Sequence, residues 1–269
     1  MPAHRAFPLQ LVNQVIDELG EESHRWDDNL FLHKTLRACA LVSKRWTAPS
    51  RVHLFRKVKI EGDRHKHTIT PPAIILPYVK ELEVYYDHYP TQPTPIGDFL
   101  KAFVAAPIEC LVITGVALVD ERACIQETID AHSATLHTVE FGSCSLSTHN
   151  ITDIFLGRHH LRSLRLVDCK SHQLPSPGQP LIANAPDSGA HSKAVELELG
   201  IFGGDPFEGS ADVVSMVTQL QYRFKRLDFD HIVAGEEATE VTNALIKANA
   251  DVLSSLRVRF LAGMFESSN

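Results

Sequence analysis

Residues 136–144 and 161–169 read LHTVEFGSC and LRSLRLVDC, and the pattern that these two stretches share decides the fold. Each begins with an apolar residue, places others three and five positions later, and ends with a cysteine eight positions later. Side chains two residues apart on a strand point to the same side. The pairs Val139/Phe141 and Leu164/Leu166 therefore predict short strands with one apolar face.

Eight copies of this template run from residue 55 to residue 258. Their central apolar residues are Val58, Leu82, Leu111, Val139, Leu164, Leu197, Leu227 and Leu256, which gives steps of 24, 29, 28, 25, 33, 30 and 29 residues. Helical periodicity lies between the copies, at residues 96–106, 123–136, 147–156, 210–220 and 236–249. A period of about 20–29 residues with this spacing is the signature of leucine-rich repeats. We therefore expect an α/β solenoid shaped as a horseshoe, with parallel strands on its concave face.

The five cysteines are expected to be free thiols. Cys144 and Cys169 occupy the template position that follows the strand, where a small buried side chain is required, so we interpret them as core residues. The chain contains no CxxC pair, and an odd, scattered set of cysteines is typical of a reducing compartment. We expect the protein in the cytoplasm or the nucleus.

The first 52 residues lack the template and have helical periodicity instead. Pro8 precedes an apolar stripe that includes Val12 and Ile16 and is expected to end at Gly20. A second helical stretch runs to Trp46. We therefore divide the chain into a helical domain at 1–52 and a degenerate repeat domain at 53–269, which stops directly after a predicted strand as a truncated form of a longer protein would.

The helical domain resembles an F-box. Residues 7–19 (FPLQLVNQVIDEL) match its Pro-Leu start and first apolar helix, and residues 36–46 (LRACALVSKRW) match its closing Val-Ser-Lys-x-Trp block. Residues 51–58 (RVHLFRKV) resemble the strand entry that follows the F-box in the large fungal F-box families. Together with the repeats, the resemblance is to F-box proteins with leucine-rich repeats.

The resemblance implies a substrate-recognition subunit of an SCF-type ubiquitin ligase, with no catalysis and no cofactor of its own. F-box proteins bind a Skp-family adaptor, which carries them onto a cullin–RING ligase, and the repeats hold a protein substrate. The adaptor contacts implied by the match are Pro8, Leu9, Leu11, Val12, Val15, Ile16, Leu41, Val42, Ser43 and Trp46. The alternative is that these helices only cap the solenoid, leaving a protein-interaction scaffold with no ligase role.

Charge is distributed unevenly along a chain of net charge −7. Residues 34–59 carry eight Lys and Arg side chains and no Asp or Glu. This segment is either a solvated face or a surface that steers toward an acidic partner, which the resemblance implies the Skp-family adaptor would supply. Nucleic-acid binding is less favoured, because no recognised motif accompanies the segment. The predicted strands also carry outward charges of both signs, which predict no ligand of a single charge. These candidates for the substrate face are Glu83, Glu140, Arg165, Glu198, Asp228 and Arg257.

Motifs for catalysis are missing from the sequence. It contains no P-loop, no G-x-G-x-x-G, no G-x-S-x-G and no set of metal ligands with structural spacing, so we predict neither an enzyme nor a metal site. An enzyme on a doubly wound sheet is the weakest alternative. No apolar run reaches the ~18 residues of a membrane helix, and we expect no membrane partner.

Overall fold

The strand template forms one open parallel sheet of eight strands in a computed structural model of the chain. The structure describes residues 8–25, 30–62, 70–86, 96–147, 151, 154, 160–171, 197–202, 214, 217, 224–233 and 236–261. Together with six α-helices in these residues, the sheet makes a mixed α/β fold, as the alternation predicts.

The helices and strands follow one another along the chain. The helices are α1 (Leu9–Arg25), α2 (Leu30–Val42), α3 (Lys44–Leu54), α4 (Ile96–Ala102), α5 (Leu118–Ala131) and α8 (Glu236–Ala248), with a short 3-10 helix η1 (Leu76–Tyr78). The strands of the large sheet are β1 (Lys57–Glu61), β2 (Glu81–Tyr85), β3 (Cys110–Thr114), β4 (Thr138–Gly142), β6 (Ser163–Val167), β8 (Leu197–Phe202), β9 (Phe224–Val233) and β10 (Ser255–Leu261). Two short strands, β5 (Ser145–Leu146) and β7 (Lys170–Ser171), pair separately.

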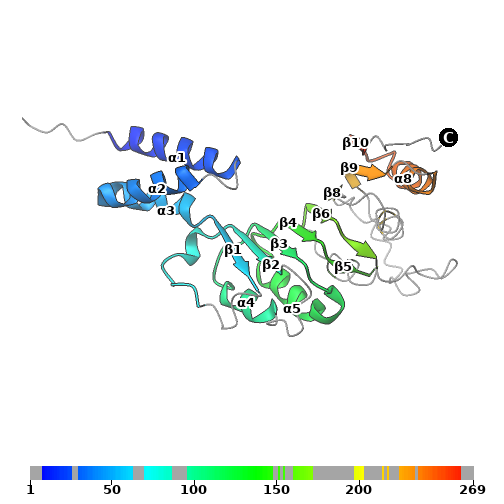
Figure 1. The fold of residues 1–269 in the computed structure, drawn as a ribbon, viewed down its shortest axis with the longest axis horizontal. Helices are drawn as coiled ribbons and strands as arrows, with labels where there is room; N and C mark the ends of the chain where they lie inside the picture. Colours follow the sequence, from blue (N-terminus) through cyan, green and yellow to red (C-terminus); the bar gives the residue numbers. More distant parts are fainter. Residues whose placement is uncertain are drawn as a thin grey trace, which may run out of the picture.

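The large sheet keeps its strands in sequence order, β1-β2-β3-β4-β6-β8-β9-β10, and every neighbouring pair is parallel. Figure 1 shows the strands following an arc, with α4 and α5 covering one face and α1–α3 at the β1 end. The opposite face carries no helix among the described residues. The crossovers that contain α4 and α5 therefore return over the same side of the sheet.

The register aligns the templates across the whole sheet. Their last apolar residues are direct neighbours from strand to strand: Ile60, Val84, Ile113, Phe141, Leu166, Ile201, Phe229 and Val258. The predicted central residue of the sixth copy is wrong, because Leu164 pairs with Leu199 and not with Leu197. A slip of two residues leaves the apolar face unchanged, so the side-chain pattern alone does not distinguish the two registers.

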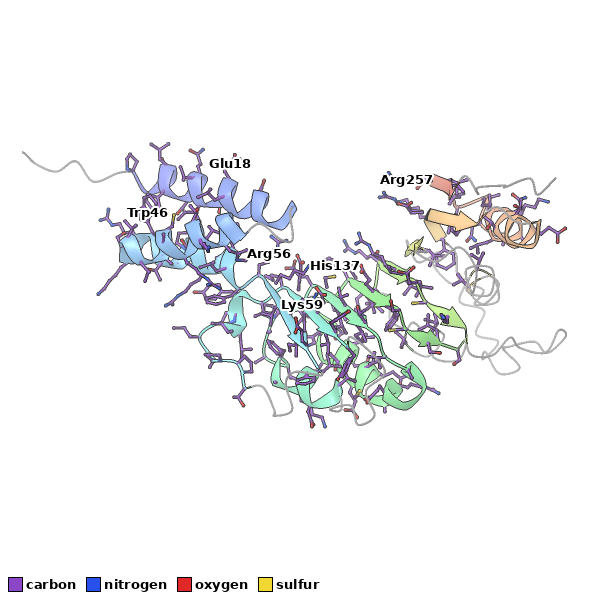
Figure 2. All side chains as sticks on the ribbon, viewed as in Figure 1. Glu18, Trp46, Arg56, Lys59, His137 and Arg257 are labelled. Carbon is purple, nitrogen blue, oxygen red and sulfur yellow. The ribbon has the colours of Figure 1, made fainter. Side chains whose placement is uncertain are left out.

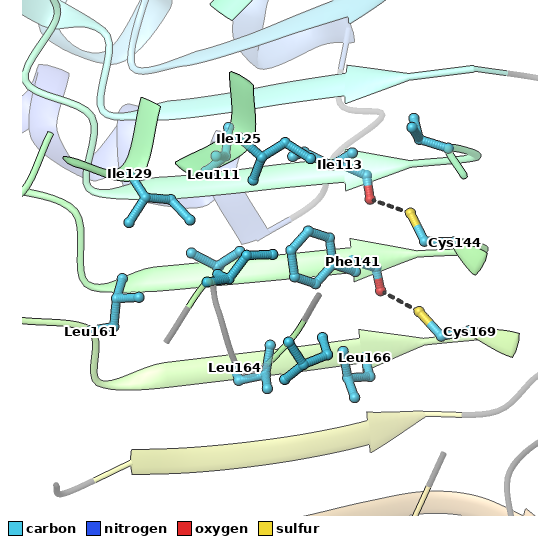
Figure 3. Packing of buried hydrophobic residues seen from close by; sticks show 14 of the residues in the cluster. Leu111, Ile113, Ile125, Ile129, Phe141, Cys144, Leu161, Leu164, Leu166 and Cys169 are labelled. Carbon is cyan, nitrogen blue, oxygen red and sulfur yellow. Dashed lines mark hydrogen bonds between the residues drawn. The ribbon is translucent and has the colours of Figure 1, made fainter. Parts of the chain in front are cut away.

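The core lies between the sheet and its helices. Apolar side chains at alternate strand positions meet the inward faces of α4 and α5, where Phe99, Ile125 and Ile129 are fully buried. Figure 3 shows Phe141 at the centre of this layer, between the side chains of neighbouring strands. Full burial of one such side chain contributes about 1.5–3 kcal/mol, so this layer is the main source of stability in the sheet region.

The turn after the strand repeats in successive copies. Gly115, Ser143 and Asp168 each follow a strand with positive φ values of 77°, 47° and 50°. The next residues of the second and third turns are Cys144 and Cys169, which are buried and donate S–H hydrogen bonds of 3.3 and 3.1 Å to the carbonyl oxygens of Ile113 and Phe141 (Figure 3). The prediction that both thiols are core residues is confirmed.

The predicted helices differ from the observed ones mainly at their ends. Helix α8 lies where it was predicted and α4 is four residues shorter, whereas α5 begins at Leu118, before the predicted start at 123. Of the segments at 147–156 and 210–220, the structure describes Ile151, Ile154, Val214 and Val217 as helical and Ser147 as not helical. The other residues of these segments lie outside the described part of the chain.

The prediction that the first helix ends at Gly20 is wrong, since α1 continues to Arg25. Gly20 is buried inside the helix, where a Cβ atom would overlap the ring of His53 on α3. Gly20 therefore leaves room for α3 to cross α1, and it does not end α1. The second helical stretch is two helices, because the chain turns at Ser43 between α2 and α3.

Candidate partner-binding surfaces

The three N-terminal helices pack around a small core of their own. Val12, Ile16 and Leu36 are buried together, with Trp46 and Leu54 against them. Helix α3 reaches Leu54, two residues beyond the predicted domain boundary at 52, and leads directly into β1. We call α1–α3 the helical unit.

A polar side-chain contact joins α1 and α3, the first and last helices of this unit. The Nε2 atom of His53 on α3 lies 2.9 Å from Oδ1 of Asp17 on α1, and the imidazole is 9% exposed. The ring packs against Gly20, one turn further along α1. These contacts fix how α1 crosses α3, and therefore which side chains of α1 remain exposed on the surface of the unit.

Six large apolar side chains stay exposed on the helical unit; one is Val52, near the end of α3, and we call the other five the distal patch. They are Leu9 (51% exposed), Leu11 (45%), Val15 (45%), Leu41 (87%) and Val42 (67%). The start of α1, the end of α2 and the start of α3 lie together at the end of the unit farthest from the sheet (Figure 1). Exposed apolar side chains grouped in this way mark an interaction surface more often than scattered ones do.

The ten residues implied by the F-box resemblance fall into two groups. Pro8 and Ser43 are exposed beside the distal patch, whose five residues were all predicted, and Trp46 is half-buried behind them. Val12 and Ile16 are 2% and 0% exposed, so in this structure they belong to the core of the helical unit and not to its surface. Their role is to hold α1 in place beneath the patch.

The cations of residues 34–59 also divide into two groups. Arg56, Lys57 and Lys59 lie at the sheet and form ion pairs of 3.0–3.4 Å with Glu81 or Glu83. The others, on α2 and α3, form no ion pair within the described part of the chain; they are Lys34, Arg37, Lys44, Arg45 and Arg51. Lys44 and Arg45, at the start of α3, therefore accompany the distal patch and remain available to a partner.

The helix-free side of the sheet, which we call the open face, is polar. Its central row reads Lys59, Glu83, Val112, Glu140, Arg165, Gly200, Asp228 and Arg257 from β1 to β10. Figure 2 shows Arg257 and His137 on the side of the ribbon away from α4 and α5. The row contains every predicted outward charge except Glu198, which the register places in the flanking row opposite Arg226.

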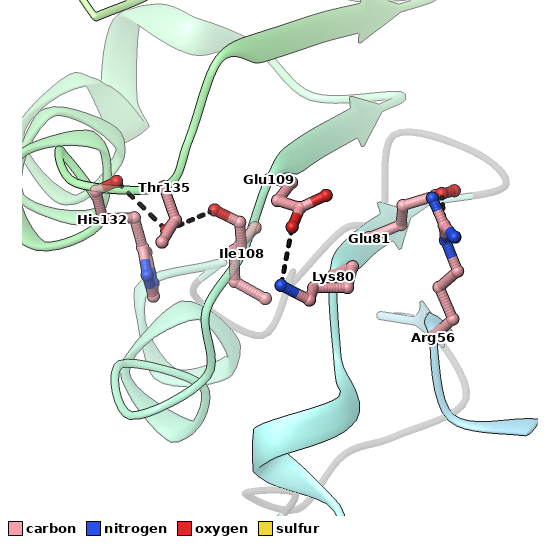
Figure 4. A network of polar contacts seen from close by, with 7 residues as sticks. All are labelled: Arg56, Lys80, Glu81, Ile108, Glu109, His132 and Thr135. Atoms are coloured by element: carbon pink, nitrogen blue, oxygen red, sulfur yellow. Dashed lines mark hydrogen bonds and ion pairs between the residues drawn. The ribbon is translucent and has the colours of Figure 1, made fainter. Parts of the chain in front are cut away.

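Ion pairs also join neighbouring strands at their N-terminal ends, which we call the strand entries. Lys80 donates a hydrogen bond of 2.6 Å to Glu109, and Arg56 pairs with Glu81 at 3.4 Å (Figure 4). Beneath them, the Thr135 hydroxyl donates to the carbonyl oxygen of Ile108 at 2.8 Å. These contacts join successive strand entries, so they maintain the arc and are not candidates for ligand binding.

Raised pKa values make Cys110, Cys124 and Cys144 poor nucleophiles. Burial, reinforced by Glu81 and Glu140, raises the pKa of Cys110 to about 11, and burial raises the pKa of Cys144 to about 11 as well. Burial and the neighbouring Glu121 raise the pKa of Cys124 to about 12. The nucleophilic form of cysteine is the thiolate, so these thiols are unreactive at neutral pH. No cluster of three His, Cys, Asp or Glu side chains suited to a metal ion occurs in the residues that the structure describes.

Comparison with known proteins leaves the family open. No family model matches the chain, and no curated protein matches it. Among the described helices, none combines the length and the apolar character that crossing a membrane requires. The distal patch and the open face are therefore the features from which a function can be inferred.

Proposed function

We propose that this protein is the substrate-recognition subunit of an SCF-type ubiquitin ligase. In this proposal the helical unit is an F-box that binds a Skp-family adaptor, and through it a cullin–RING ligase. The eight-stranded sheet with its helices is a leucine-rich-repeat horseshoe that holds a protein substrate on the open face. The observation that carries the proposal is the distal patch. All five of its residues are among the adaptor contacts that the F-box resemblance implies.

The exposure of the distal patch supports a partner of the helix-in-groove kind. Leu41 and Val42 are 87% and 67% exposed, an unfavourable state for aliphatic side chains that recurs at interfaces. Covering one aliphatic side chain fully contributes about 1.5–3 kcal/mol. Several such contacts provide the driving force for a stable complex.

The position of the patch also separates the adaptor role from the cap role. A helical unit that only caps the sheet would direct its spare apolar side chains toward β1. Instead, the junction is made by the end of α3 and by η1, whereas the patch lies at the opposite end of the unit (Figure 1). Capping accounts for the contact of α3 with η1 but not for the exposure of Leu41.

The repeat part of the proposal is supported by the sheet. Parallel strands in sequence order and in matching register, each followed in several copies by the same turn, are what stacked repeats produce. The free cysteines fit the reducing environment of the cytoplasm or nucleus, where this class of ligase works.

Capture of purified Skp-family adaptor by the full chain tests the proposal. The variant Leu41→Asp/Val42→Asp adds two charges to the most exposed part of the patch and should reduce capture at least about a hundredfold, since each carboxylate would be desolvated in the complex. The matched control is Val104→Asp, because Val104 is 51% exposed but lies beyond α4, in the sheet region.

Retained capture by the control, with loss in the patch variant at unchanged melting temperature, supports the adaptor role. Equal capture by all three proteins would place the contact elsewhere. Failure of the folded wild type to bind would leave the cap interpretation and a repeat scaffold without a ligase role.

A further inference from the structure

The open face presents its charges unequally. Three ion pairs join neighbouring strands in its central row: Lys59–Glu83 at 3.0 Å, Arg165–Glu140 at 3.5 Å and Arg257–Asp228 at 3.7 Å. The acidic side chains are 15%, 24% and 17% exposed, whereas their basic partners are 50%, 54% and 52% exposed. The carboxylates lie against the sheet, and an approaching molecule meets the cationic heads first.

The two arginines keep most of their hydrogen-bonding capacity. Their contacts of 3.5 and 3.7 Å exceed the ordinary hydrogen-bond distance, unlike the 2.6 Å contact of Lys80 with Glu109 at the strand entries. Neither Arg165 nor Arg257 forms another hydrogen bond or ion pair within the described residues. A guanidinium group carries five N–H donors in a fork that matches a carboxylate, so both arginines can bind one more acid.

We propose that the open face binds an acidic polypeptide segment, whose Asp and Glu side chains accept hydrogen bonds from Arg165 and Arg257. Lys59, near the β1 end of the same row, supplies a third cation. The inference rests on the proposed function only in calling the bound segment a substrate. It names the substrate class as a segment rich in Asp and Glu, lying across the strands.

The register sets the spacing of the acidic groups. Arg165 and Arg257 are three strand steps apart, and Lys59 is four steps from Arg165 on the other side. At about 4.8 Å per step these separations are ~14 and ~19 Å, which an extended chain at about 3.3 Å per residue covers in about four and about six residues. Val112 and Gly200, the uncharged positions of the row, leave space between the cations for the segment to pass.

A basic segment fits this face less well. Each carboxylate of the central row already has a cationic partner from a neighbouring strand. Oδ1 of Asp228 is buried and has no hydrogen-bond partner in the described structure, so an ammonium group arriving from solvent would not reach it. A basic ligand would also meet the half-exposed cations first, at a cost in repulsion.

Fluorescence anisotropy with the full chain tests the inference without the adaptor. The probes are labelled peptides of about twelve residues, long enough to cross the row at about 3.3 Å per residue, in which Ser alternates with Glu, Gln or Lys. We expect binding of the Glu peptide alone, weakened by raising NaCl from about 50 to about 200 mM. The variant Arg165→Gln/Arg257→Gln should weaken it about tenfold, the sum of two partly exposed charge contacts.

Two further variants make the result specific. Arg122→Gln, on the exposed surface of α5 across the sheet, removes the same type of charge and should leave binding unchanged. Arg165→Lys/Arg257→Lys keeps the charge but loses the forked donors, and should give an intermediate affinity.

Equal binding of the Gln or Lys peptide, no binding of the Glu peptide, or full binding by the Gln variant would overturn the inference. Failure of the adaptor experiment would not affect this one. The two experiments change different residues, on the helical unit and on the sheet, so their failures are distinguishable.

Discussion

The helical unit and the sheet use apolar side chains in opposite ways. Among the described residues, the core of the sheet region contains 34 buried apolar side chains, and that of the helical unit contains three. Yet six of the nine large exposed apolar side chains belong to the helical unit: the distal patch and Val52. The sheet region buries most of its apolar side chains in its own core, whereas the helical unit leaves part of its apolar surface exposed for a partner.

The charges follow the same division. On the open face and along the strand entries, opposite charges pair between neighbouring strands. At the start of α3, Lys44 and Arg45 lie beside the distal patch and form no ion pair in the described chain. Mutations that act on one region and not on the other test this division.

The largest effect is expected in the sheet core. Phe141 is fully buried at the centre of the sheet, and Phe141→Ala should lower the free energy of unfolding by about 3–5 kcal/mol through lost burial and the cavity left behind. Chemical denaturation followed by far-UV circular dichroism measures the loss. Ile16→Ala in the smaller core should cost less, about 2–3 kcal/mol, and an equal or larger loss there would contradict the comparison.

The contact of α1 with α3 gives a sharper test. Gly20→Ala places a Cβ atom against the buried ring of His53 and should destabilise the helical unit by about 1–2 kcal/mol despite the better helix propensity of alanine. In a His53→Ala background the same change should stabilise by up to about 1 kcal/mol, because only the propensity remains. A double-mutant cycle by thermal denaturation measures both values, and an unchanged sign would exclude the contact.

The sheet region should also be more sensitive to acid than the helical unit. Desolvation lowers the pKa of His132 below its usual 6.5, although a hydrogen bond with the backbone of Ala106 opposes the shift, and its Nε2 has no partner in the described structure. The unfolded chain therefore binds a proton more readily, so stability is lost as the pH falls below about 6.5. Comparing melting temperatures at several pH values with those of His132→Gln isolates this contribution, which the variant should lack.

The smallest effect concerns the turn after β4. Ser143 adopts a φ of 47°, in the left-handed region that glycine occupies at the equivalent Gly115. Ser143→Gly should therefore raise the free energy of unfolding by about 0.5–1 kcal/mol, once the lower strain exceeds the entropy cost of glycine. A loss of stability in the same denaturation assay would show that the repeated turn is not strained.

The sequence predicts the sheet well because its signal is repeated. Eight copies of one spacing define which strand faces are apolar, and burial requires that pattern in every copy. The sixth copy shows the limit of this reasoning, since Leu197 and Leu199 share a face and only strand pairing selects Leu199. The helical unit has no repeated pattern that could be compared between copies. The role of Gly20 depends on its contact with His53, which lies 33 residues away in the sequence.

The candidate surfaces were predicted in part. An apolar stripe on α1 is visible in the sequence, but which of its residues face inward depends on how α3 crosses it, and this crossing buries Val12 and Ile16 while leaving Leu11 and Val15 outside. On the open face the sequence gives the signs of the charges. Their exposure, which distinguishes Arg165 from Glu140, depends on side-chain length and on pairing between strands.

Hydrogen–deuterium exchange of the full chain, with and without purified Skp-family adaptor, tests the central claim most directly. The account predicts slower exchange near the start of α1 and across the junction of α2 and α3, with the strands of the sheet unchanged. Protection of the strands or of the junction between α3 and η1, or no protection anywhere, would contradict the claim that the helical unit is the adaptor-binding region.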